Sequence, residues 1–490
     1  MKPTQITHFV MMGDSLSDRG TLDHQYLLGC IPMASLSGLQ QHSPLGRFTN
    51  GLAWNDHLSA RLANQFLITD FARKDQLSPG QRDRDDTDIA DDIIDHDPLS
   101  PRSPLDPSDI SDDVLDRDPR VENLEQNGYF LNNDRSVKFE GRDFVRNYDE
   151  GGLTAYDYSW MPSTSVSRFV SRIILSTLDY MREKLLSYDR QHELSRAHKA
   201  QTLIIEWSGA NDLITVNARP SDIEVKRAVA ARVKNVEELI KNGYCHFVLF
   251  NLPNLALTPR YQAKSEAERL NAQEASASFN KALYVASQNL TKLYPHASIE
   301  VFDVDGLFAQ VYQAPADFGF DQSKLTHPYV QSADFKINAD RTSPAPGYMF
   351  WDDVHPTAKL HAILAERFYQ RFQLEYNFSA PVEEAVHLEE LHISAHALCA
   401  AFIEKYGKKL ADDKSGFFGH FRQSNIKFRH ASLEAILDHA LNGGGHRTRE
   451  VLIELQWIDK LGNLNLNIPA LKEAMAQVDL NASRPIAPAL

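Results

Sequence analysis

Short, mostly apolar runs alternate with longer amphipathic stretches through the first 380 residues, and this alternation constrains the fold more than any other feature of the sequence. The apolar runs lie at 9–12, 202–207, 246–250 and 299–303. The longer stretches, which have helical periodicity, lie at 53–62, 166–188, 221–242, 265–293 and 357–376. Short strands that alternate with helices are typical of a parallel sheet with helices on both faces, so the sequence predicts a doubly wound α/β fold.

The first apolar run ends in Gly13-Asp14-Ser15, which would present one hydroxyl at the carboxyl end of a buried strand. Ligand and reaction sites of open α/β sheets collect at this end. A serine there can also offer its own backbone N–H to an oxyanion, near the positive end of the next helix. Taken alone, the pattern fits an ordinary turn, so its meaning depends on a base, an orienting acid and further oxyanion donors downstream.

Composition and charge exclude several classes of protein. With 490 residues, of which 42% are apolar, the chain can form a large core and more than one domain. The net charge of −15 argues against general nucleic-acid binding, which needs a basic surface. The sequence has no apolar run of about 18 residues or more, so we expect no transmembrane helix.

The cysteines and the first residues bear on the compartment. Cys30, Cys245 and Cys399 lie far apart, which suits a reducing compartment without a disulfide framework and excludes a cysteine zinc site. The first residues lack the pattern of a secretory signal peptide. We therefore expect a cytoplasmic protein, or one that is exported without a signal peptide, and the residues require neither a metal ion nor a cofactor.

An aspartate-rich segment interrupts the alternation. Residues 81–120 contain 14 Asp and 5 Arg but neither Lys nor Glu, and Asp88–Pro98 recurs 21 residues later as Asp109–Pro119. Such a segment cannot bury enough apolar surface to order itself, so we expect a disordered insertion at about 75–125. A calcium-binding or partner-docking insert is the alternative.

The strand pattern ends near residue 380, and helical stretches follow at 383–406, 431–441, 447–459 and 468–478. The sequence thus predicts two domains, residues 1–380 with the insertion inside them and a helical accessory module at 382–490. Residues 306–350 mix proline, aromatic and polar residues, so we expect loops over the site there.

Asp352 and His355 lie three residues apart, before the last helix of the first domain. Within one turn, the carboxylate can reach Nδ1 of the imidazole, which leaves Nε2 free to accept a proton. Pro356 keeps His355 out of the helical region of backbone conformation. His355 would then deprotonate Ser15 and later protonate the leaving alcohol. A solvated pair of Asp352 and Asp353 is the alternative.

A negative tetrahedral intermediate needs preorganised hydrogen-bond donors, and the sequence offers three candidates. They are the N–H of Ser15, the N–H of Gly152, which precedes the predicted helix at 166–188, and the side-chain amide of Asn211, which follows a strand. Taken singly, Gly152 fits a plain turn and Asn211 fits a helix cap. Their occurrence together with the predicted base and acid, in this order, indicates a serine esterase.

These motifs together resemble the GDSL (SGNH) family of serine esterases and lipases, over roughly residues 6–376. The blocks that match are Gly13-Asp14-Ser15-Leu16, Asn147-Tyr148-Asp149-Glu150-Gly151-Gly152, Gly209-Ala210-Asn211-Asp212 and Asp352-x-x-His355. The resemblance implies the flavodoxin-like fold of the family, with Ser15 as nucleophile and with Asp352 and His355 as its partners. It also implies that Ser15, Gly152 and Asn211 form the oxyanion hole.

Within the family, further features resemble bacterial phospholipases A and glycerophospholipid–cholesterol acyltransferases. These features lie at 17–20, 46–51, 251–259 and 351–352. Many members of that subgroup have a signal peptide and some have a disulfide, and this sequence departs from both patterns and by its acidic insertion. The C-terminal module resembles accessory modules of effectors from intracellular bacterial pathogens, which would imply delivery into a host cell.

Three functions fit these residues. The first is hydrolysis of acyl-lipid esters, as a phospholipase A or lysophospholipase, or acyl transfer to a sterol, with peripheral membrane contact. The second is deacetylation of a carbohydrate or another small ester. The third is an effector whose helical module and acidic insert bind a regulatory host partner such as a protein activator. Six aromatic residues would favour a lipid tail if they formed an apolar rim instead of core: Phe48, Trp54, Phe318, Phe320, Tyr348 and Phe350.

Overall fold

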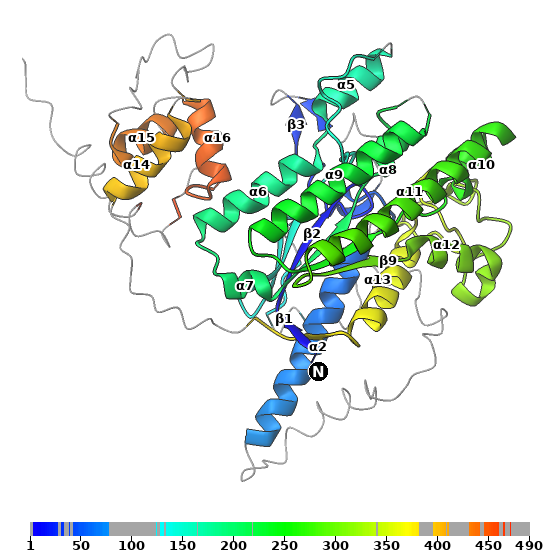
Figure 1. Cartoon of the computed structure of the whole chain (residues 1–490), viewed down its shortest axis with the longest axis horizontal. Helices are drawn as coiled ribbons and strands as arrows, with labels where there is room; N and C mark the ends of the chain where they lie inside the picture. Colours follow the sequence, from blue (N-terminus) through cyan, green and yellow to red (C-terminus); the bar gives the residue numbers. More distant parts are fainter. Residues whose placement is uncertain are drawn as a thin grey trace, which may run out of the picture. The chain divides into compact units, whose positions relative to one another are not determined.

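We describe the protein from a computed structural model, shown in Figure 1. The residues described are 3–27, 31–33, 39, 43–77, 124, 128–131, 134–163, 165–217, 219–339, 342–381, 395–407, 409–410, 431–441, 445–459, 464–465 and 471. The acidic segment 81–120 with both copies of its repeat, Cys30, the start of the expected helix 383–406 and most of the expected helix 468–478 lie outside the described residues. The chain divides into two compact units, Met1–Val382 and Glu383–Leu490.

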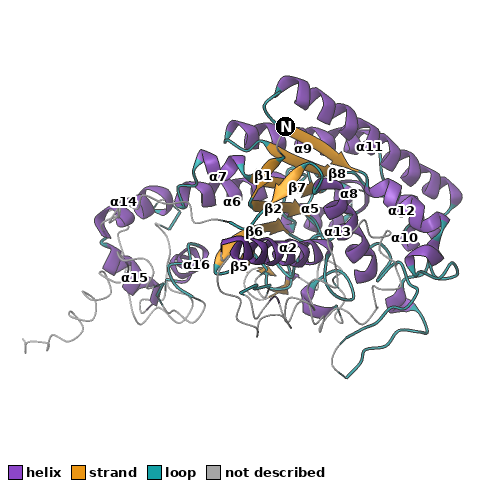
Figure 2. Cartoon of the chain, turned by 90° about the horizontal axis from the view of Figure 1, so that it is seen from below, coloured by secondary structure: helices purple, strands orange, loops and turns teal. Residues whose placement is uncertain are grey.

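A six-stranded sheet runs through the first unit (Figure 2). In spatial order its strands are β5 (Ser136–Phe139), β6 (Arg142–Asp149), β2 (His8–Gly13), β7 (Thr202–Trp207), β8 (His246–Phe250) and β9 (Ser298–Phe302). Neighbouring strands are parallel except β5 and β6, which are antiparallel. Two short pairs accompany the sheet, namely β1 (Thr4–Ile6) with β10 (Tyr376–Phe378) and β3 (Tyr26–Leu27) with β4 (Ile31–Pro32).

Helices cover both faces of this sheet. The α-helices of the first unit are α2 (Trp54–Leu77), α5 (Val166–Ile174), α6 (Leu178–Gln191), α7 (Arg196–Ala200), α8 (Ala210–Ile214), α9 (Asp222–Lys241), α10 (Pro259–Gln262), α11 (Glu266–Leu293), α12 (Val304–Gln313) and α13 (Ala358–Phe372). Short 3-10 turns lie at η1 (Pro44–Gly46), η3 (Leu255–Leu257), η4 (Pro315–Phe318) and η5 (Tyr329–Gln331). Helices α6, α9 and α11 lie on one face and α2 and α13 on the other (Figure 2). The expected α/β fold with a mostly parallel sheet is therefore confirmed.

The three central strands end at the same level. In the register of the sheet, Gly13 at the end of β2 pairs with Asp149 of β6 on one side and with Trp207 of β7 on the other. Parallel strands present their carboxyl ends at one edge of a sheet. The segments that follow these three strands, which contain the candidate nucleophile and the candidate oxyanion donors, therefore meet at this edge.

The expected single helix at 166–188 is wrong, because the structure has two helices, α5 and α6, separated by an extended break. Across this break the N–H of Thr154 donates to the carbonyl of Ser176 (3.0 Å), and the N–H of Leu178 donates to the carbonyl of Thr154 (2.9 Å). Thr177 caps the start of α6 with its side chain. These bonds to a distant segment compensate for the interrupted helix, and helical periodicity cannot reveal them.

Strands β5 and β6 are absent from the sequence-based prediction. The motif at 147–152 precedes helix α5, as expected, but it also begins inside β6 and continues past the end of that strand. In β6, Arg142, Asp143, Arg146 and Asn147 break the continuous apolar run that marks the other strands. A strand near the edge of the sheet tolerates such residues because it is less enclosed by helices.

Three predicted boundaries also differ. The helix expected at 53–62 continues to residue 77 as α2, and the region expected to form loops at 306–350 begins inside helix α12. The closing helix stops at Phe372 and not at Tyr376, because β10 follows it and pairs with β1 at the start of the chain. Pairing between the two ends of the domain is a long-range contact that local patterns do not indicate.

The second unit contains three described helices, α14 (Ala395–Tyr406), α15 (Leu433–Leu441) and α16 (His446–Glu454). They pack round an apolar core of their own, formed mainly by Phe402, Ile436, Leu437, Leu452 and Trp457. The expectation of a helical C-terminal region is therefore confirmed, while its role as an accessory module stays a prediction.

A buried ion pair joins helix α9 to the site end of the sheet. Arg232 of α9 and Glu206 of β7 are both fully buried and form an ion pair. The guanidinium also donates to the carbonyls of Ser208 (3.2 Å) and Phe250 (2.9 Å), which lie at the ends of β7 and β8. One side chain thus fixes the ends of two neighbouring strands.

We expect Arg232→Leu to lower the free energy of unfolding by about 3–5 kcal/mol, because it leaves the Glu206 carboxylate buried without its partner. Urea unfolding followed by fluorescence measures the change. The matched control is Arg227→Leu on the same helix, whose partly exposed pair with Glu224 should contribute no more than about 1 kcal/mol. Equal effects of the two substitutions would contradict the role given to Arg232.

Candidate active site

Ser15, His355 and Asp352 lie in one hydrogen-bonded row at the carboxyl edge of the sheet. Nε2 of His355 is 2.7 Å from Oγ of Ser15, although the two residues are 340 positions apart. Nδ1 of the same ring is 2.7 Å from Oδ2 of Asp352. The structure therefore brings the three predicted residues together in the geometry that general-base activation of a serine requires.

The Asp352 carboxylate has two tasks in this turn. Its Oδ1 accepts the N–H of Val354 (2.9 Å) and the N–H of His355 (2.8 Å), while Oδ2 faces the imidazole. Burial acts to raise the pKa of Asp352, but His355 and the two backbone N–H groups outweigh burial and lower this pKa. Asp352 is therefore held ionised, which suits the stabilisation of an imidazolium.

The neighbouring carboxylate belongs to a different contact. Asp353 pairs with Arg260 through both of its oxygens, at 2.7 and 3.1 Å. The alternative of a solvated pair of carboxylates at 352–353 is therefore wrong, since one binds the imidazole and the other binds a guanidinium.

The ring of His355 also rests on an aromatic side chain. Its centroid is 4.9 Å from that of Phe48, which is buried and follows η1. Phe48 therefore restricts the tilt of the imidazole ring, whereas Asp352 holds the ring through its Nδ1 atom. The position of the base thus depends on a segment about 300 residues away in sequence.

The three candidate oxyanion donors line one cavity of about 290 Å³ together with His355. Gly152 has a φ of +82°, a backbone conformation that favours glycine, and a Cβ there would also press on the Leu175 side chain at 2.5 Å from Cδ2. The Asn211 amide nitrogen donates to the carbonyl of Leu153 (3.0 Å), and its oxygen accepts from Thr215 (2.5 Å). These bonds fix the orientation of the amide, whose nitrogen has a second hydrogen for a substrate oxyanion.

Two buried aspartates, to which no role was assigned from the sequence, join the three segments. The carboxylate of Asp18, in the loop after the nucleophile, accepts the N–H groups of Gly20 (2.9 Å), Thr21 (2.6 Å) and Gly151 (2.6 Å). It therefore connects the Ser15 loop to the residue before Gly152. The Asp-x-Gly pattern at 18–20, which favours a local turn, is the one sequence signal that could have indicated this role.

Asp212 acts in the same way on the other side. Its two oxygens accept the N–H groups of Ala155 (2.8 Å) and Tyr156 (3.0 Å), so it links the start of α8 to the chain after Gly152. Burial raises the pKa of Asp18 and of Asp212 to about 7 each, against the backbone hydrogen bonds, which lower it. Both are positioning residues, because neither lines the cavity.

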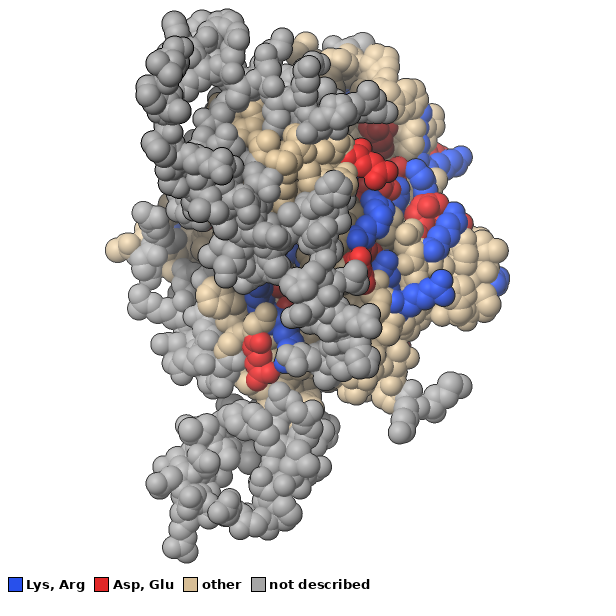
Figure 3. Space-filling view, turned by 90° about the vertical axis from the view of Figure 1, so that its left-hand side faces the viewer, with Lys and Arg blue, Asp and Glu red and all other residues tan. Residues whose placement is uncertain are grey.

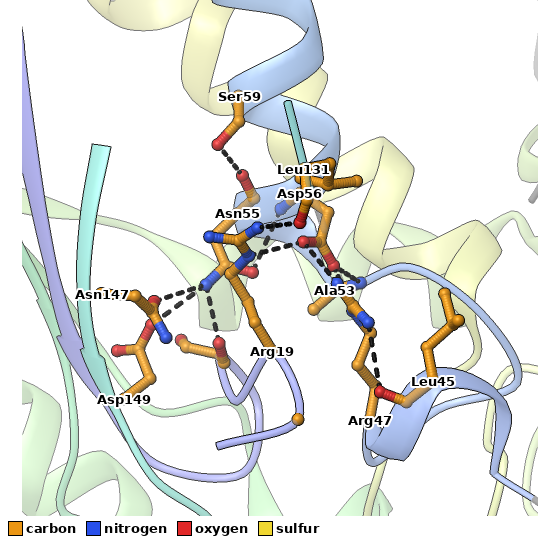
Figure 4. A network of polar contacts seen from close by, with 12 residues as sticks. Arg19, Leu45, Arg47, Ala53, Asn55, Asp56, Ser59, Leu131, Asn147 and Asp149 are labelled. Carbon is orange, nitrogen blue, oxygen red and sulfur yellow. Dashed lines mark hydrogen bonds and ion pairs between the residues drawn. The ribbon is translucent and has the colours of Figure 1, made fainter. Parts of the chain in front are cut away.

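A buried network of charged side chains lies behind this site (Figure 4). Asp56 of α2 accepts from Nε of Arg19 (2.7 Å) and from Nε and Nη2 of Arg47 (2.5 and 2.9 Å). Asn55 beside it donates to the carbonyl of Ser17 (2.6 Å). Burial acts to raise the pKa of Asp56, but Arg47 and Arg19 outweigh burial and hold this pKa below its usual range. Since Arg47 precedes Phe48, the network supports the aromatic contact to the base.

We expect Asp56→Asn to lower the free energy of unfolding at neutral pH by about 3–5 kcal/mol, because two guanidinium groups lose their counter-charge. The folded-state pKa of Asp56 is lowered, so its contribution is present above the unfolded pKa of about 4 and is lost as the pH falls through the folded pKa. The difference between the native protein and Asp56→Asn should therefore narrow below about pH 4.

Urea unfolding at a series of pH values measures that difference. Glu238→Gln is the matched control. The Glu238 carboxylate is exposed and pairs with Lys241, which lies on α9 as Glu238 does. The free energy of unfolding of this variant should match that of the native protein at every pH in the series. If the difference in free energy of unfolding between the native protein and Asp56→Asn stays constant down to pH 2, the role given to the ionised Asp56 carboxylate is contradicted.

The cavity has a mixed lining. Of the six aromatic residues considered for an apolar rim, Phe48 lines the cavity. The other five pack in cores or against them: Trp54, Phe318, Phe320, Tyr348 and Phe350. The other apolar residues that line the cavity were not assigned to it from the sequence, and they are Leu16, Leu175, Ala210, Ile214, Pro253, Leu255, Phe308, Val354 and Pro356.

Charges of both signs lie side by side on the face shown in Figure 3. Lys234 pairs with Asp179 (2.7 Å), and Lys241 pairs with Glu238 (2.7 Å).

Among the described residues there is no group of three His, Cys, Asp or Glu side chains placed to bind a metal ion. None of the helices in the described part of the chain has the length and apolar character of a membrane span.

Comparison with known proteins bears on this site. The family model described as GDSL-like lipase/acylhydrolase matches residues 106–368, more than half of the chain. The matched range includes Gly152, Asn211, Asp352 and His355 and begins after Ser15.

Three relatives named for lipid chemistry, secretion or haemolysis share about a quarter of the aligned residues. A phosphatidylcholine-sterol acyltransferase of Aeromonas hydrophila is 26% identical over 48% of this chain and 76% of its own length. The secreted effector protein SseJ of Salmonella typhimurium is 27% identical over 48% of this chain and 52% of its own length. A thermolabile hemolysin of Vibrio parahaemolyticus is 26% identical over 40% of this chain and 48% of its own length. This chain therefore spans about half the length of the second and third relatives.

Proposed function

This chain belongs to the GDSL-like lipase/acylhydrolase family of carboxylic-ester hydrolases, and from that premise we propose that it cleaves esters of acyl lipids through an acyl-enzyme on Ser15. The observation that supports the proposal most strongly is the row from Ser15 through His355 to Asp352, with 2.7 Å at each step.

In the proposed reaction, Oγ of Ser15 attacks the ester carbonyl carbon while Nε2 of His355 takes the hydroxyl proton. Asp352 stabilises the imidazolium that forms. The negative oxygen of the tetrahedral intermediate accepts hydrogen bonds from the N–H groups of Ser15 and Gly152 and from the amide of Asn211, each of which is worth about 3–4 kcal/mol in such sites.

The intermediate then collapses. The C–O bond to the leaving alcohol breaks, His355 protonates that alcohol, and the acyl group stays on Ser15. Water attacks the acyl-enzyme by the same route in hydrolysis, and the hydroxyl of a sterol does so in acyl transfer. Both outcomes use the same residues, so the choice between them depends on which nucleophile enters the cavity.

The lining of the cavity supports an acyl chain over a small polar ester. The apolar side chains that line the same space as the nucleophile include Leu16, Phe48, Leu175, Ile214, Leu255, Phe308 and Val354. Burial of an alkyl chain against such side chains contributes about 0.8 kcal/mol per methylene. A deacetylase would have little use for this surface. The name of the first relative, a phosphatidylcholine-sterol acyltransferase, supports a phospholipid as acyl donor.

The relative named a secreted effector supports a role outside the producing cell, with delivery into a host. We also propose that the helical module at 382–490 and the acidic insert at about 75–125 bind a regulatory host partner. A translocation reporter fused to the chain tests delivery, and co-purification of host proteins with residues 1–490 tests the partner. Retention of the reporter inside the producing cell would contradict delivery.

We expect Ser15→Ala to reduce hydrolysis of p-nitrophenyl butyrate, and of phosphatidylcholine in vesicles with cholesterol, by a factor of at least about 10³. The unfolding midpoint should stay the same, since Ser15 contributes one hydroxyl at a surface cavity. Chromatography of the lipid products separates free fatty acid from cholesteryl ester. The exposed serine change Ser159→Ala is the control, and appreciable turnover by Ser15→Ala would contradict the role of Ser15.

Asp352→Asn separates the two tasks of this carboxylate. The amide oxygen can still accept the N–H groups of Val354 and His355, so the turn should survive. The amide nitrogen would face Nδ1 and favour the wrong tautomer of His355, which should lower kcat by a factor on the order of 10³ to 10⁴. Steady-state kinetics together with thermal unfolding measure both effects. A variant with near-native kcat would exclude Asp352 as the orienting acid.

A further inference from the structure

Helix α5 presents an apolar stripe outward. Val166, Phe169, Val170 and Ile173 follow the spacing i, i+3, i+4 and i+7, which places them on one face of the helix. Their exposed fractions are 78%, 42%, 39% and 54%, and no residue of α5 is fully buried. Amphipathic helices of folded domains usually turn their apolar stripe towards the core. An apolar stripe that faces outward therefore indicates a surface that binds another molecule or a membrane.

The helix is held to the body of the domain by polar contacts. Arg172 donates to the carbonyl of Val216 (3.0 Å), to the carbonyl of Pro162 (2.8 Å) and to Oδ1 of Asn217 (2.7 Å). Ile174, at the flank of the stripe, packs against the cluster that contains Phe48. These contacts fix the orientation of α5, so the stripe is exposed because of how the helix is attached.

Helix α5 also forms part of the wall of the proposed active site. Ser171 and Leu175, on the side of the helix away from the stripe, line the same cavity as Ser15 and His355. A helix with its side chains is about 10 Å across, so a surface that docks on the stripe would lie about one helix diameter from this cavity wall. A ligand that leaves such a surface could enter the cavity after a short displacement.

The composition of α5 fits a lipid surface. The helix has two cations, Arg168 and Arg172, and no Asp or Glu, whereas the whole chain has a net charge of −15. The guanidinium of Arg172 is bound to the domain, and Asp157 and Asp179 are the nearest acidic residues before and after the helix. Trp160, in the loop before α5, is 65% exposed. Apolar helix faces with flanking Arg and Trp are the composition with which amphipathic helices insert into the interface of a bilayer.

We infer that the outer face of α5, with Trp160, docks on a phospholipid bilayer and so holds the bilayer about one helix diameter from the cavity. The inference rests on the proposed function, because it names the physical state in which the lipid substrate is presented. Docking by this face brings the esters at the headgroup level near to Ser15.

Val170→Glu combined with Ile173→Glu tests the inference, since both side chains are exposed and neither lines the cavity. Flotation of the purified full chain with vesicles of phosphatidylcholine and phosphatidylglycerol should show at least a tenfold loss of bound protein. Hydrolysis of phospholipid in those vesicles should fall at least tenfold, while hydrolysis of soluble p-nitrophenyl butyrate should stay within twofold of native.

The matched control is Leu270→Glu combined with Val285→Glu, which changes two exposed apolar side chains of α11, at 50% and 47% exposure. It should bind and hydrolyse vesicles as the native protein does. Equal losses in the two double variants would overturn the inference, because they would reflect added charge alone.

Three further outcomes would also overturn the inference: native vesicle binding by the α5 variant, no vesicle binding by the native chain, or a change from dimer to monomer on gel filtration, which would make a second copy the occupant. Failure of the proposed function gives a different result. If the native chain hydrolyses no ester, flotation of Ser15→Ala still measures docking by itself.

Discussion

The common level at which three parallel strands end is the constraint on which the rest of this structure depends. Hydrogen bonding between β6, β2 and β7 fixes Gly13 between Asp149 and Trp207, so the segments beyond these strands begin side by side. Register in a buried sheet is strongly specified, because a slip of one residue would turn every side chain to the opposite face. The hydroxyl, the backbone donor and the amide donor of the candidate site inherit their positions from this pairing.

Buried carboxylates then convert that coarse alignment into a fixed geometry. Asp18 and Asp212 bind backbone N–H groups of neighbouring segments, while Asp352 binds both a turn and an imidazole. A buried carboxyl oxygen left without its donors would cost free energy, and for the ionised Asp352 the bonds are also charge-assisted and therefore stronger. Movement of any one segment would therefore leave such a group without partners, which opposes independent motion of the loops.

The sequence was sufficient for the α/β fold, because continuous apolar runs mark the central strands, and for the expectation that Ser15, Asp352 and His355 lie together, because few residue types perform this chemistry. It was insufficient for β6, whose charged residues hide the strand, and for the break between α5 and α6, which depends on backbone bonds to Thr154. Asp18 and Asp212 escaped because their partners are backbone groups, which are the same in every residue. The cavity lining escaped because its members come from segments far apart in the chain.

The packing around Gly13 has a consequence for how such sites decay. A Cβ at this position would lie 2.9 Å from the carbonyl oxygen of Trp207 and 3.0 Å from Oδ1 of Asp149, so the strand pairing itself excludes any side chain. The glycine of the Gly-Asp-Ser motif thus serves the architecture, and the serine serves the chemistry. In a descendant released from selection for catalysis, the hydroxyl could be replaced freely while the glycine would persist, and its survival alone would be no sign of a working enzyme.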